Sequence, residues 1–207
     1  MKKLVVLLGI SGVLLANAVR ADTTLVFNEI MYHPPVNEPA MEWIEFHNQL
    51  AVDLDVSGWT VGGGISYTFP NNSVVPGRGY VVLAINPAAL QAETGLANIF
   101  GPFTGRLGNG GDTLELRNNS GRLMDRVNYD VDGKWPVGPD GAGVSLAKRD
   151  RNTASSPAEN WTWSEQLGGT PGADNFPLVG VALPEVQLIA LESEWKYEAS
   201  GQDPGIA

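Results

Sequence analysis

The chain has 207 residues, a formal net charge of −10 and no cysteine. The lack of cysteine excludes disulfides, thiolate metal sites and a lipid-modified N-terminal cysteine, and the negative charge disfavours nucleic acid and anionic membranes as partners. The 25 glycines and 14 prolines, with only 17% charged residues, are typical of short strands joined by many turns.

Residues 1–21 predict a secretory signal peptide. A pair of lysines precedes the apolar run 4–16, which is shorter than the roughly 20 residues of a membrane-spanning helix. We expect cleavage after Ala21, with Ala18 as the alternative site and an uncleaved anchor as the alternative interpretation. Cleavage after Ala21 leaves 10 basic and 23 acidic residues, a net charge of −13. The protein is therefore expected in a bacterial cell envelope, including the periplasm, or outside the cell, without a membrane span after cleavage.

Beyond the signal peptide, apolar runs of four to eight residues alternate with clusters of Gly, Pro and Asn. This spacing predicts an all-β sandwich. Strands are expected near 24–32, 42–48, 58–62, 66–69, 79–85, 113–117, 122–129, 143–148 and 160–164. One short helix is possible within 87–95, and no long segment has helical periodicity.

The run 113–117 has a clear two-residue period, with leucines expected inside the sandwich and charges outside. Turn-forming residues follow at 118–121, so we predict a hairpin with the strand 122–129. Asp125 shares a face of that second strand with Val127, which predicts that its carboxylate lies on the inner side. A carboxylate there is expected to accept a hydrogen bond from an indole or from a loop backbone.

The most informative stretch is 25–59, in which LVFNEIMYHPP, EWIEFHN and DLDVSGW follow one another. Together with Phe69-Pro70, the GGD run 110–112 and the GGTPG run 168–172, it resembles the lamin tail domain, an immunoglobulin-like β-sandwich. The resemblance covers roughly 24–176 and places the sandwich domain at 22–176. It implies structural roles for a set of motif residues: Glu29, Glu45, Gly58, Trp59, Pro70, Gly111, Asp112 and Asp125.

The composition changes after residue 176. We predict a linker at 177–189 and, at 190–207, the truncated start of a second β module. A short tail that packs back on the sandwich is the alternative. If the chain is the front part of a larger exported protein, any enzymatic activity is expected in the missing C-terminal domains.

The sequence offers little for catalysis. It has two histidines, no Gly-x-Ser-x-Gly turn and no phosphate loop that ends in Gly-Lys-Ser/Thr. If the first two strands paired suitably, His33 and His47 could meet Glu29 and Glu45 in a zinc-like site. The alternative is that the glutamates are hydrogen-bonded in the sandwich and the histidines cap strand ends.

The run 130–133 reads Asp-Val-Asp-Gly, with Asp140 nearby. Alternate carboxylates before a glycine begin many calcium loops, so Asp130, Asp132 and Asp140 are the candidate calcium ligands. The series stops at Lys134, and the alternative is a turn held by Asx hydrogen bonds. We therefore expect no cofactor, with calcium as the one exception to test.

Trp161 and Trp163 lie two apart on a predicted strand. Exposed indoles could stack on sugar rings or contact a partner, whereas buried indoles would close one end of the core. Three functions follow. The first is a non-catalytic secreted module that contacts proteins or surface polymers, or serves as an accessory module of a larger protein. The second is a carbohydrate-binding domain, with or without calcium, and the third is a metal-dependent hydrolase. The resemblance implies neither filament assembly, because heptads are lacking, nor the DNA and chromatin contacts of nuclear lamins.

Overall fold

The computed structural model describes residues 24–177. The predicted signal peptide, almost all of the linker and the second module lie outside these residues. The chain divides into two compact units, Met1–Phe176 and Pro177–Ala207, and the fold below belongs to the first. Within the described residues, no helix is long and apolar enough to cross a membrane.

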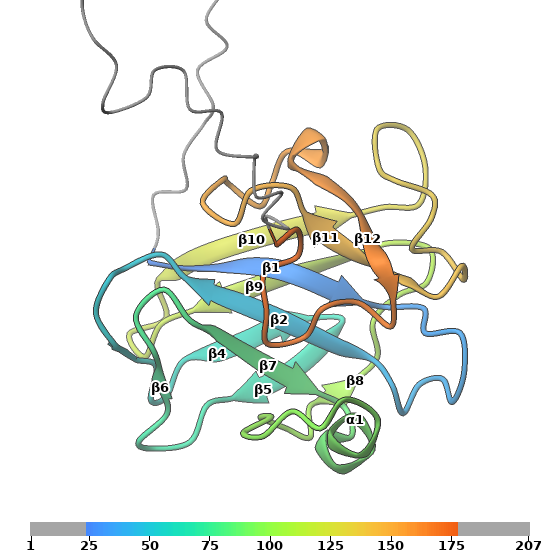
Figure 1. The fold of residues 1–207 in the computed structure, drawn as a ribbon. Coiled ribbons are helices and arrows are strands. Elements are labelled where there is room, and N and C mark those ends of the chain that lie inside the picture. The colour runs from blue at the N-terminus through green and yellow to red at the C-terminus, as the bar shows by residue number, and fades with distance from the viewer. Residues whose placement is uncertain (1–23, 178–207) are drawn as a thin grey trace, which may run out of the picture. The chain divides into compact units, whose positions relative to one another are not determined.

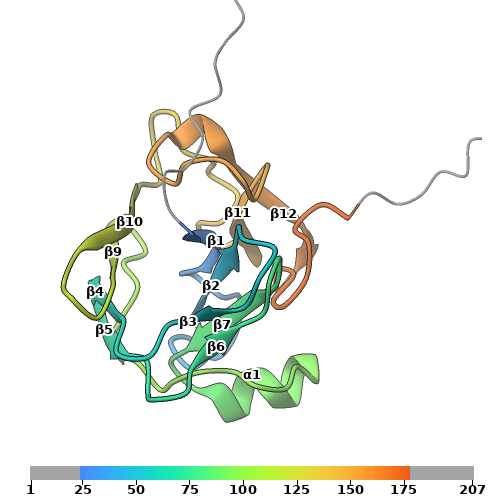
Figure 2. The same cartoon turned by 90° about the vertical axis from the view of Figure 1, so that its left-hand side faces the viewer.

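Two five-stranded antiparallel sheets face each other, as Figures 1 and 2 show. The first sheet has the order β12 (Trp161–Leu167), β11 (Val144–Lys148), β1 (Leu25–Met31), β2 (Trp43–Asn48) and β7 (Tyr80–Ala84). The second has the order β10 (Leu123–Tyr129), β9 (Asp112–Arg117), β4 (Thr60–Gly63), β5 (Ile65–Thr68) and β8 (Thr104–Gly105). A separate pair of short strands consists of β3 (Leu54–Asp55) and β6 (Val74–Val75).

The all-β sandwich that the sequence predicts is confirmed. Each of the nine expected strands overlaps an observed one, and α1 (Pro87–Thr94) occupies the expected helical segment. The sequence did not predict β3, β6 and β8, which have two residues each and are too short to show a period. A single 3-10 turn (Ala158–Asn160) leads into β12.

The main core fills the space between the sheets. Phe27 of β1 and Phe46 of β2 pair across their strands with ring centroids 4.8 Å apart, and Phe69 meets Phe46 edge-on. Leu114 and Leu116 enter from β9 and are fully buried, as the alternation predicted. Burying each such side chain stabilises the fold by about 1.5–3 kcal/mol. This core sets the distance between the sheets and the orientation of the strands that carry the site.

The hairpin of β9 and β10 is also confirmed, with Val127 opposite Leu114. Its turn depends on Asn118, whose Oδ1 accepts hydrogen bonds from the backbone of Ser120 and Arg122. An Asn side chain that replaces backbone partners in this way is the expected chemistry of a tight turn. A register shift at Met124 in β10 brings Asp125 opposite Leu116 on the inner side.

Both faces of β1 and β2 are buried. Their inner face contacts the main core, whereas their outer face is covered by residues 168–175, which we call the covering segment, and by Leu90 of α1. A bulge at Asn28 shifts the register between Phe27 and Glu29, so the β1 side chains beyond it exchange faces relative to a regular strand. The bulge is what directs Glu29 to the outer, covered side.

Helix α1 begins and ends as its sequence requires. Asn86 caps it by accepting a hydrogen bond from Ala89 N, Pro87 occupies the first turn, and Gly95 ends it in the left-handed region with φ of 71°. Leu90 is its one buried residue and joins a second apolar cluster with Met31 and Trp43 on the outer face of the first sheet.

Candidate functional site

The two motif glutamates meet beneath the covering segment. Glu29 and Glu45 are direct partners across β1 and β2, and neither is exposed. Glu29 accepts hydrogen bonds from the Thr170 backbone and hydroxyl, at 2.9 Å each, and from the Ser145 hydroxyl. Glu45 accepts one from the backbone of Gly172 at 2.5 Å. The pair therefore fastens the covering segment onto the centre of the first sheet.

Two asparagines complete this polar cluster. The Asn28 amide donates to Glu45 Oε1 and to Asn175 Oδ1, at 2.8 and 2.9 Å. The Asn175 amide donates in turn to the backbone oxygens of Asn28 and Lys148. Neither asparagine was predicted to take part, because the bulge that places Asn28 has no signature in a single sequence.

Burial raises the pKa of Glu29 and raises the pKa of Glu45 well above its usual value, and the neighbouring Glu29 raises the latter further. Two carboxyl groups this deeply buried favour the neutral form. A neutral carboxyl still accepts the hydrogen bonds of the covering segment, so the burial of the pair is compatible with its attachment to that segment.

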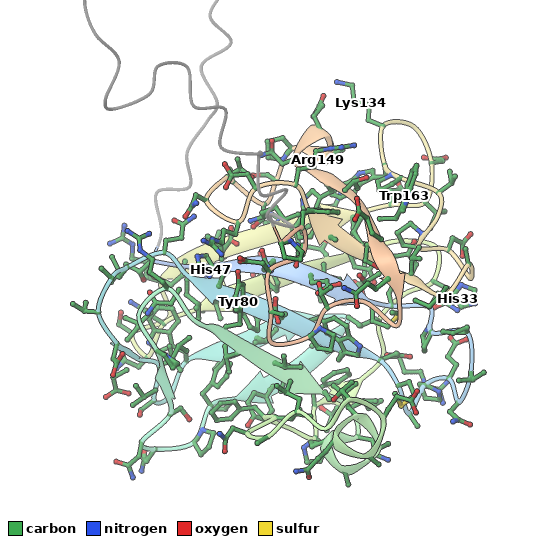
Figure 3. All side chains as sticks on the ribbon, in the orientation of Figure 1. His33, His47, Tyr80, Lys134, Arg149 and Trp163 are labelled. Carbon is green, nitrogen blue, oxygen red and sulfur yellow. The ribbon has the colours of Figure 1, made fainter. Side chains whose placement is uncertain are left out.

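The glutamates come together as the zinc hypothesis required, but the histidines do not. Because β1 and β2 are antiparallel, His47 pairs with Val26 at the start of β1, whereas His33 follows the other end of that strand. Figure 3 shows the two rings on different sides of the molecule. Among the described residues, no group of three His, Asp or Glu side chains is placed to hold a metal ion.

His47 lies in the covered face beside Tyr80, with ring centroids 4.9 Å apart. Burial lowers the pKa of His47 to about 4, and the positive Arg151 contributes in the same direction. Arg151 donates to the Tyr80 hydroxyl at 2.8 Å and pairs with Asp174 of the covering segment. This corner of the site is a packed aromatic and ionic contact that keeps the imidazole neutral.

Asp125 connects the two sheets. Its Oδ2 accepts a hydrogen bond from the Phe27 backbone at 2.8 Å and another from the Ser155 hydroxyl at 2.5 Å. The buried Lys148 donates to the same Ser155 hydroxyl at 2.8 Å and lies 5.4 Å from the Trp161 ring. Asp125 thus serves a strand backbone, while the Trp161 indole donates to Ser155 O instead.

Burial lowers the pKa of Lys148 to about 8, although Asp125 acts in the opposite direction. Burial also raises the pKa of Asp125, against the effect of Lys148. The sequence predicted the inward carboxylate but not its partner. A lysine that ends a strand is usually exposed, and nothing in the local pattern marks Lys148 as buried.

The remaining motif residues lie at a turn, in loops and at the start of β9. Gly58, with φ of 73°, donates to Phe69 O at the corner that buries Trp59. The carbonyl of Pro70 accepts the Ser73 hydroxyl. Gly111 has φ of 108°, and a side chain there would meet Tyr129 O at 2.8 Å. Asp112 accepts hydrogen bonds from the backbone of Thr113 and Gly108. Each of these contacts lies within the fold, and the structural roles that the resemblance implied for these residues stay a prediction.

The candidate calcium ligands point to different partners. Asp130 accepts the Val131 backbone at 2.7 Å, and Asp140 accepts from His33 Nδ1 at 2.8 Å. The backbone oxygen of Asp132 accepts from Trp135. These are contacts of turns and loop ends, and the three carboxylates share no ion position in the described geometry. Calcium binding stays a prediction of the sequence.

The two neighbouring tryptophans differ in exposure. Trp161 is 1% exposed and belongs to the main core, whereas Trp163 is 50% exposed. Trp163 lies on β12, an edge strand of the first sheet, and lines a shallow cleft of about 330 Å³ together with Arg149 and Glu165. Figure 3 shows Trp163 and Arg149 on this side of the molecule. A role in binding can therefore fall to Trp163 but not to Trp161.

Glu42 is a further buried group that the sequence did not single out. One of its oxygens accepts the Leu107 backbone at 2.8 Å, and the other has no hydrogen-bond partner. Burial raises the pKa of Glu42 to about 7. The side chain is 1% exposed and holds the loop that leads to β9.

Comparison with known families supports the resemblance to the lamin tail domain. No curated protein matches the chain. The model of the Lamin Tail Domain family matches residues 18–130, which include the strands from β1 to β10 and both motif glutamates. The immunoglobulin-like sandwich, with β1 and β2 at the centre of one sheet, has the architecture expected of that non-catalytic domain. The chain belongs to the lamin tail domain family.

Proposed function

We propose that the protein is an exported, non-catalytic module that contacts proteins or surface polymers of the cell envelope. The observation that carries the proposal is the half-exposed Trp163 on the edge strand β12. Tryptophan side chains are enriched in the centres of protein interfaces, because a large apolar ring is removed from water there. The family supports the coarser statement, since lamin tail domains are interaction modules.

The backbone of β12 suits a docking role. The backbone N–H of Arg149 donates to Asn160 O just before the strand, and Ala147 of β11 pairs with Thr162 of β12. In an antiparallel ladder, hydrogen-bonded pairs alternate with pairs that are not hydrogen-bonded. Ala147 and Thr162 form a hydrogen-bonded pair, so the backbone N–H and C=O of the next residue, Trp163, point away from β11. A partner strand can add to such an edge through main-chain hydrogen bonds, while Trp163 provides an apolar contact.

Carbohydrate binding is the second candidate. The cleft beside Trp163 also contains Arg149 and Glu165, and an indole with polar neighbours is a suitable platform for a sugar ring. The signal peptide predicted at 1–21, and the net charge of −13 that its removal after Ala21 would leave, agree with both candidates.

A capture experiment tests the proposal. Envelope proteins and polysaccharides from the producing cell are passed over the purified full-length chain and over a Trp163→Lys variant, with Val52→Lys at a 64% exposed valine as the control for an added surface charge. We expect a protein that the wild type and the control retain and that the Trp163 variant loses. Loss of a polysaccharide instead favours the carbohydrate candidate. If all three proteins retain the same envelope components equally, the role of Trp163 is contradicted.

N-terminal sequencing of the exported chain is a separate measurement, and it checks cleavage after Ala21.

A further inference from the structure

A second surface of the molecule has the character of a binding site. An apolar cleft of about 290 Å³ lies between the loop 33–41, helix α1 and the start of the covering segment. Its floor is formed by Met31, Trp43 and Leu90, which pack together in the second apolar cluster. The floor is therefore preformed, as is usual for binding pockets.

The rim of this apolar cleft exposes large aliphatic side chains. Val36 is 63% exposed and Leu167 is 78% exposed, and both line the cleft. A single exposed valine or leucine is ordinary, but two of them around a preformed apolar floor mark a surface that gains from being covered. Prolines at positions 34, 35 and 171 stiffen the walls, so little order has to be gained on binding.

The charge of the apolar cleft defines what can cover it. Glu93 of α1 is the one charged side chain among its lining residues, and it is exposed at the rim. The chain as a whole is acidic, which adds to the attraction of a positive group. The complementary ligand therefore has an apolar part for the floor and a cation beside it.

The volume of the apolar cleft indicates the size of the ligand. Pockets for complete drug-sized molecules range from about 300 to 1,000 Å³, so 290 Å³ suits one or two large side chains. The rim at Gly168, which is exposed and where a Cβ would meet nothing within 4 Å, leaves room for a chain to pass across the cleft.

We propose that the apolar cleft binds an extended segment of a partner protein in which a leucine-like side chain lies next to a lysine or arginine. The apolar side chain contacts Met31, Trp43 and Leu90, and the neighbouring cation pairs with Glu93. None of the residues that surround Trp163 in its own cleft lines this one, although Leu167 at the end of β12 does. The proposal therefore uses a different set of residues from the Trp163 cleft.

The test is an NMR titration of the ¹⁵N-labelled full-length chain with the peptide acetyl-Ser-Lys-Leu-Leu-Lys-Ser-amide. We expect shifts of the amides of Val36, Thr94 and Gly168, which line the cleft. Replacing both leucines of the peptide by serine is expected to weaken binding by at least about tenfold. Replacing both lysines by glutamate is expected to weaken it by a similar factor at low salt, and less at high salt.

Matched variants of the protein locate the site. Val36→Ser is compared with Val137→Ser, since these valines are 63% and 68% exposed and only the first lines the cleft. We expect the dissociation constant to rise about fivefold in the first variant and to stay within about twofold in the second. Glu93→Gln is expected to weaken binding of the lysine peptide but not of a peptide with glutamine at those positions.

The proposal is overturned by the absence of shifts at millimolar peptide, by equal binding of the lysine and glutamate peptides, or by equal effects of the two valine variants. Self-association of the chain that Val36→Ser abolishes also overturns it, because the cleft then receives a second copy. Trp163→Lys leaves the titration unchanged if the two surfaces are separate, so failure of one proposal does not imply failure of the other.

Discussion

At the scale of single residues, Glu42 connects burial with the pH dependence of stability. Its pKa is about 7 in the folded chain, against a usual value of 4.5, and burial is the main cause. An acid whose folded pKa is raised binds more protons in the folded state, so the free energy of unfolding falls as the pH rises from 4.5 to 7. A shift of this size corresponds to a loss of about 3 kcal/mol at high pH.

The variant Glu42→Gln removes this titration and keeps an oxygen for the Leu107 backbone. Between pH 4.5 and pH 8 we expect it to gain about 3 kcal/mol of unfolding free energy relative to the wild type. Urea unfolding at the two pH values measures the difference, with the exposed Glu165→Gln as control. A gap between variant and wild type that does not change with pH would show that Glu42 is already charged in the folded chain.

His47 has the opposite effect in part of the same range. Its pKa is lowered to about 4 in the folded chain from 6.5, so the unfolded chain takes up a proton first as the pH falls. Its contribution to stability is therefore complete above pH 6.5 and is lost as the pH falls toward 4. In the Glu42→Gln variant, which lacks the opposing titration of Glu42, the free energy of unfolding should therefore fall more steeply as the pH falls from 6.5 toward 4.

Gly168 and Gly169 offer a matched pair of substitutions. Both have φ near 80°, but a Cβ at Gly169 would meet Glu29 Oε1 at 2.6 Å and the Trp43 ring at 2.9 Å, whereas a Cβ at Gly168 would meet nothing within 4 Å. Alanine at Gly168 costs only the left-handed backbone, about 1–2 kcal/mol. Alanine at Gly169 adds crowding, and we expect a further 1–3 kcal/mol, approximately. Thermal unfolding measures the loss of stability in each variant. Equal losses would mean that the covering segment moves to make room for the added methyl group without a loss of stability.

At the scale of elements, the sequence predicted those strands that have a recognisable pattern. β9 and β10 follow from alternation and a turn, because one face of each meets water. β1 and β2 are buried on both faces, so they show continuous apolar runs, and their assignment depended on the motifs instead. The side to which Glu29 points could not be predicted, since it depends on the bulge at Asn28.

The covering segment is the element that local sequence explained least. Its attachment depends on partners more than 100 positions away, such as Glu29 for Thr170 and Asn28 for Asn175. Thr170→Val removes the hydroxyl that donates to Glu29 Oε2 and leaves that oxygen buried. We expect a loss of about 1–3 kcal/mol.

Hydrogen exchange of the backbone amides in 168–175 measures the effect of Thr170→Val locally. We expect faster exchange in this segment and unchanged exchange in β9, because the two do not share a sheet. Thr104→Val is the control, since the Thr104 hydroxyl makes a long, exposed contact of 3.4 Å to Ser66. Uniformly faster exchange across the domain would show that the segment does not open on its own.

At the scale of the whole molecule, Asp125 and Lys148 connect the sheets through Ser155. Asp125→Asn keeps an acceptor for the Phe27 backbone but leaves the buried lysine without its counter-charge. We expect a loss of about 2–4 kcal/mol in urea unfolding, and a smaller additional loss when Lys148→Met is combined with it. Additive losses in the double variant would show that the two groups do not interact.

The overall sandwich was predictable because its motifs are spread along the chain and agree with one another. The exposure of Trp163 was not, because it depends on position within the sheet. Trp161 and Trp163 pair with Lys148 and Leu146 of the same strand, and only the three-dimensional arrangement decides that one indole enters the core and the other reaches the surface.

The attachment of the covering segment also determines how the domain responds to a pulling force. Phe176 follows directly on Asn175, and the segment before it is hydrogen-bonded to β1 and β2 at the centre of the first sheet. Tension applied at Phe176 is therefore transmitted first to those central strands and not to the edge strand β12. A force that extends the chain must break the hydrogen bonds to Glu29 and Glu45 before it can separate β12 from β11. These bonds therefore give the domain mechanical resistance at its C-terminal end.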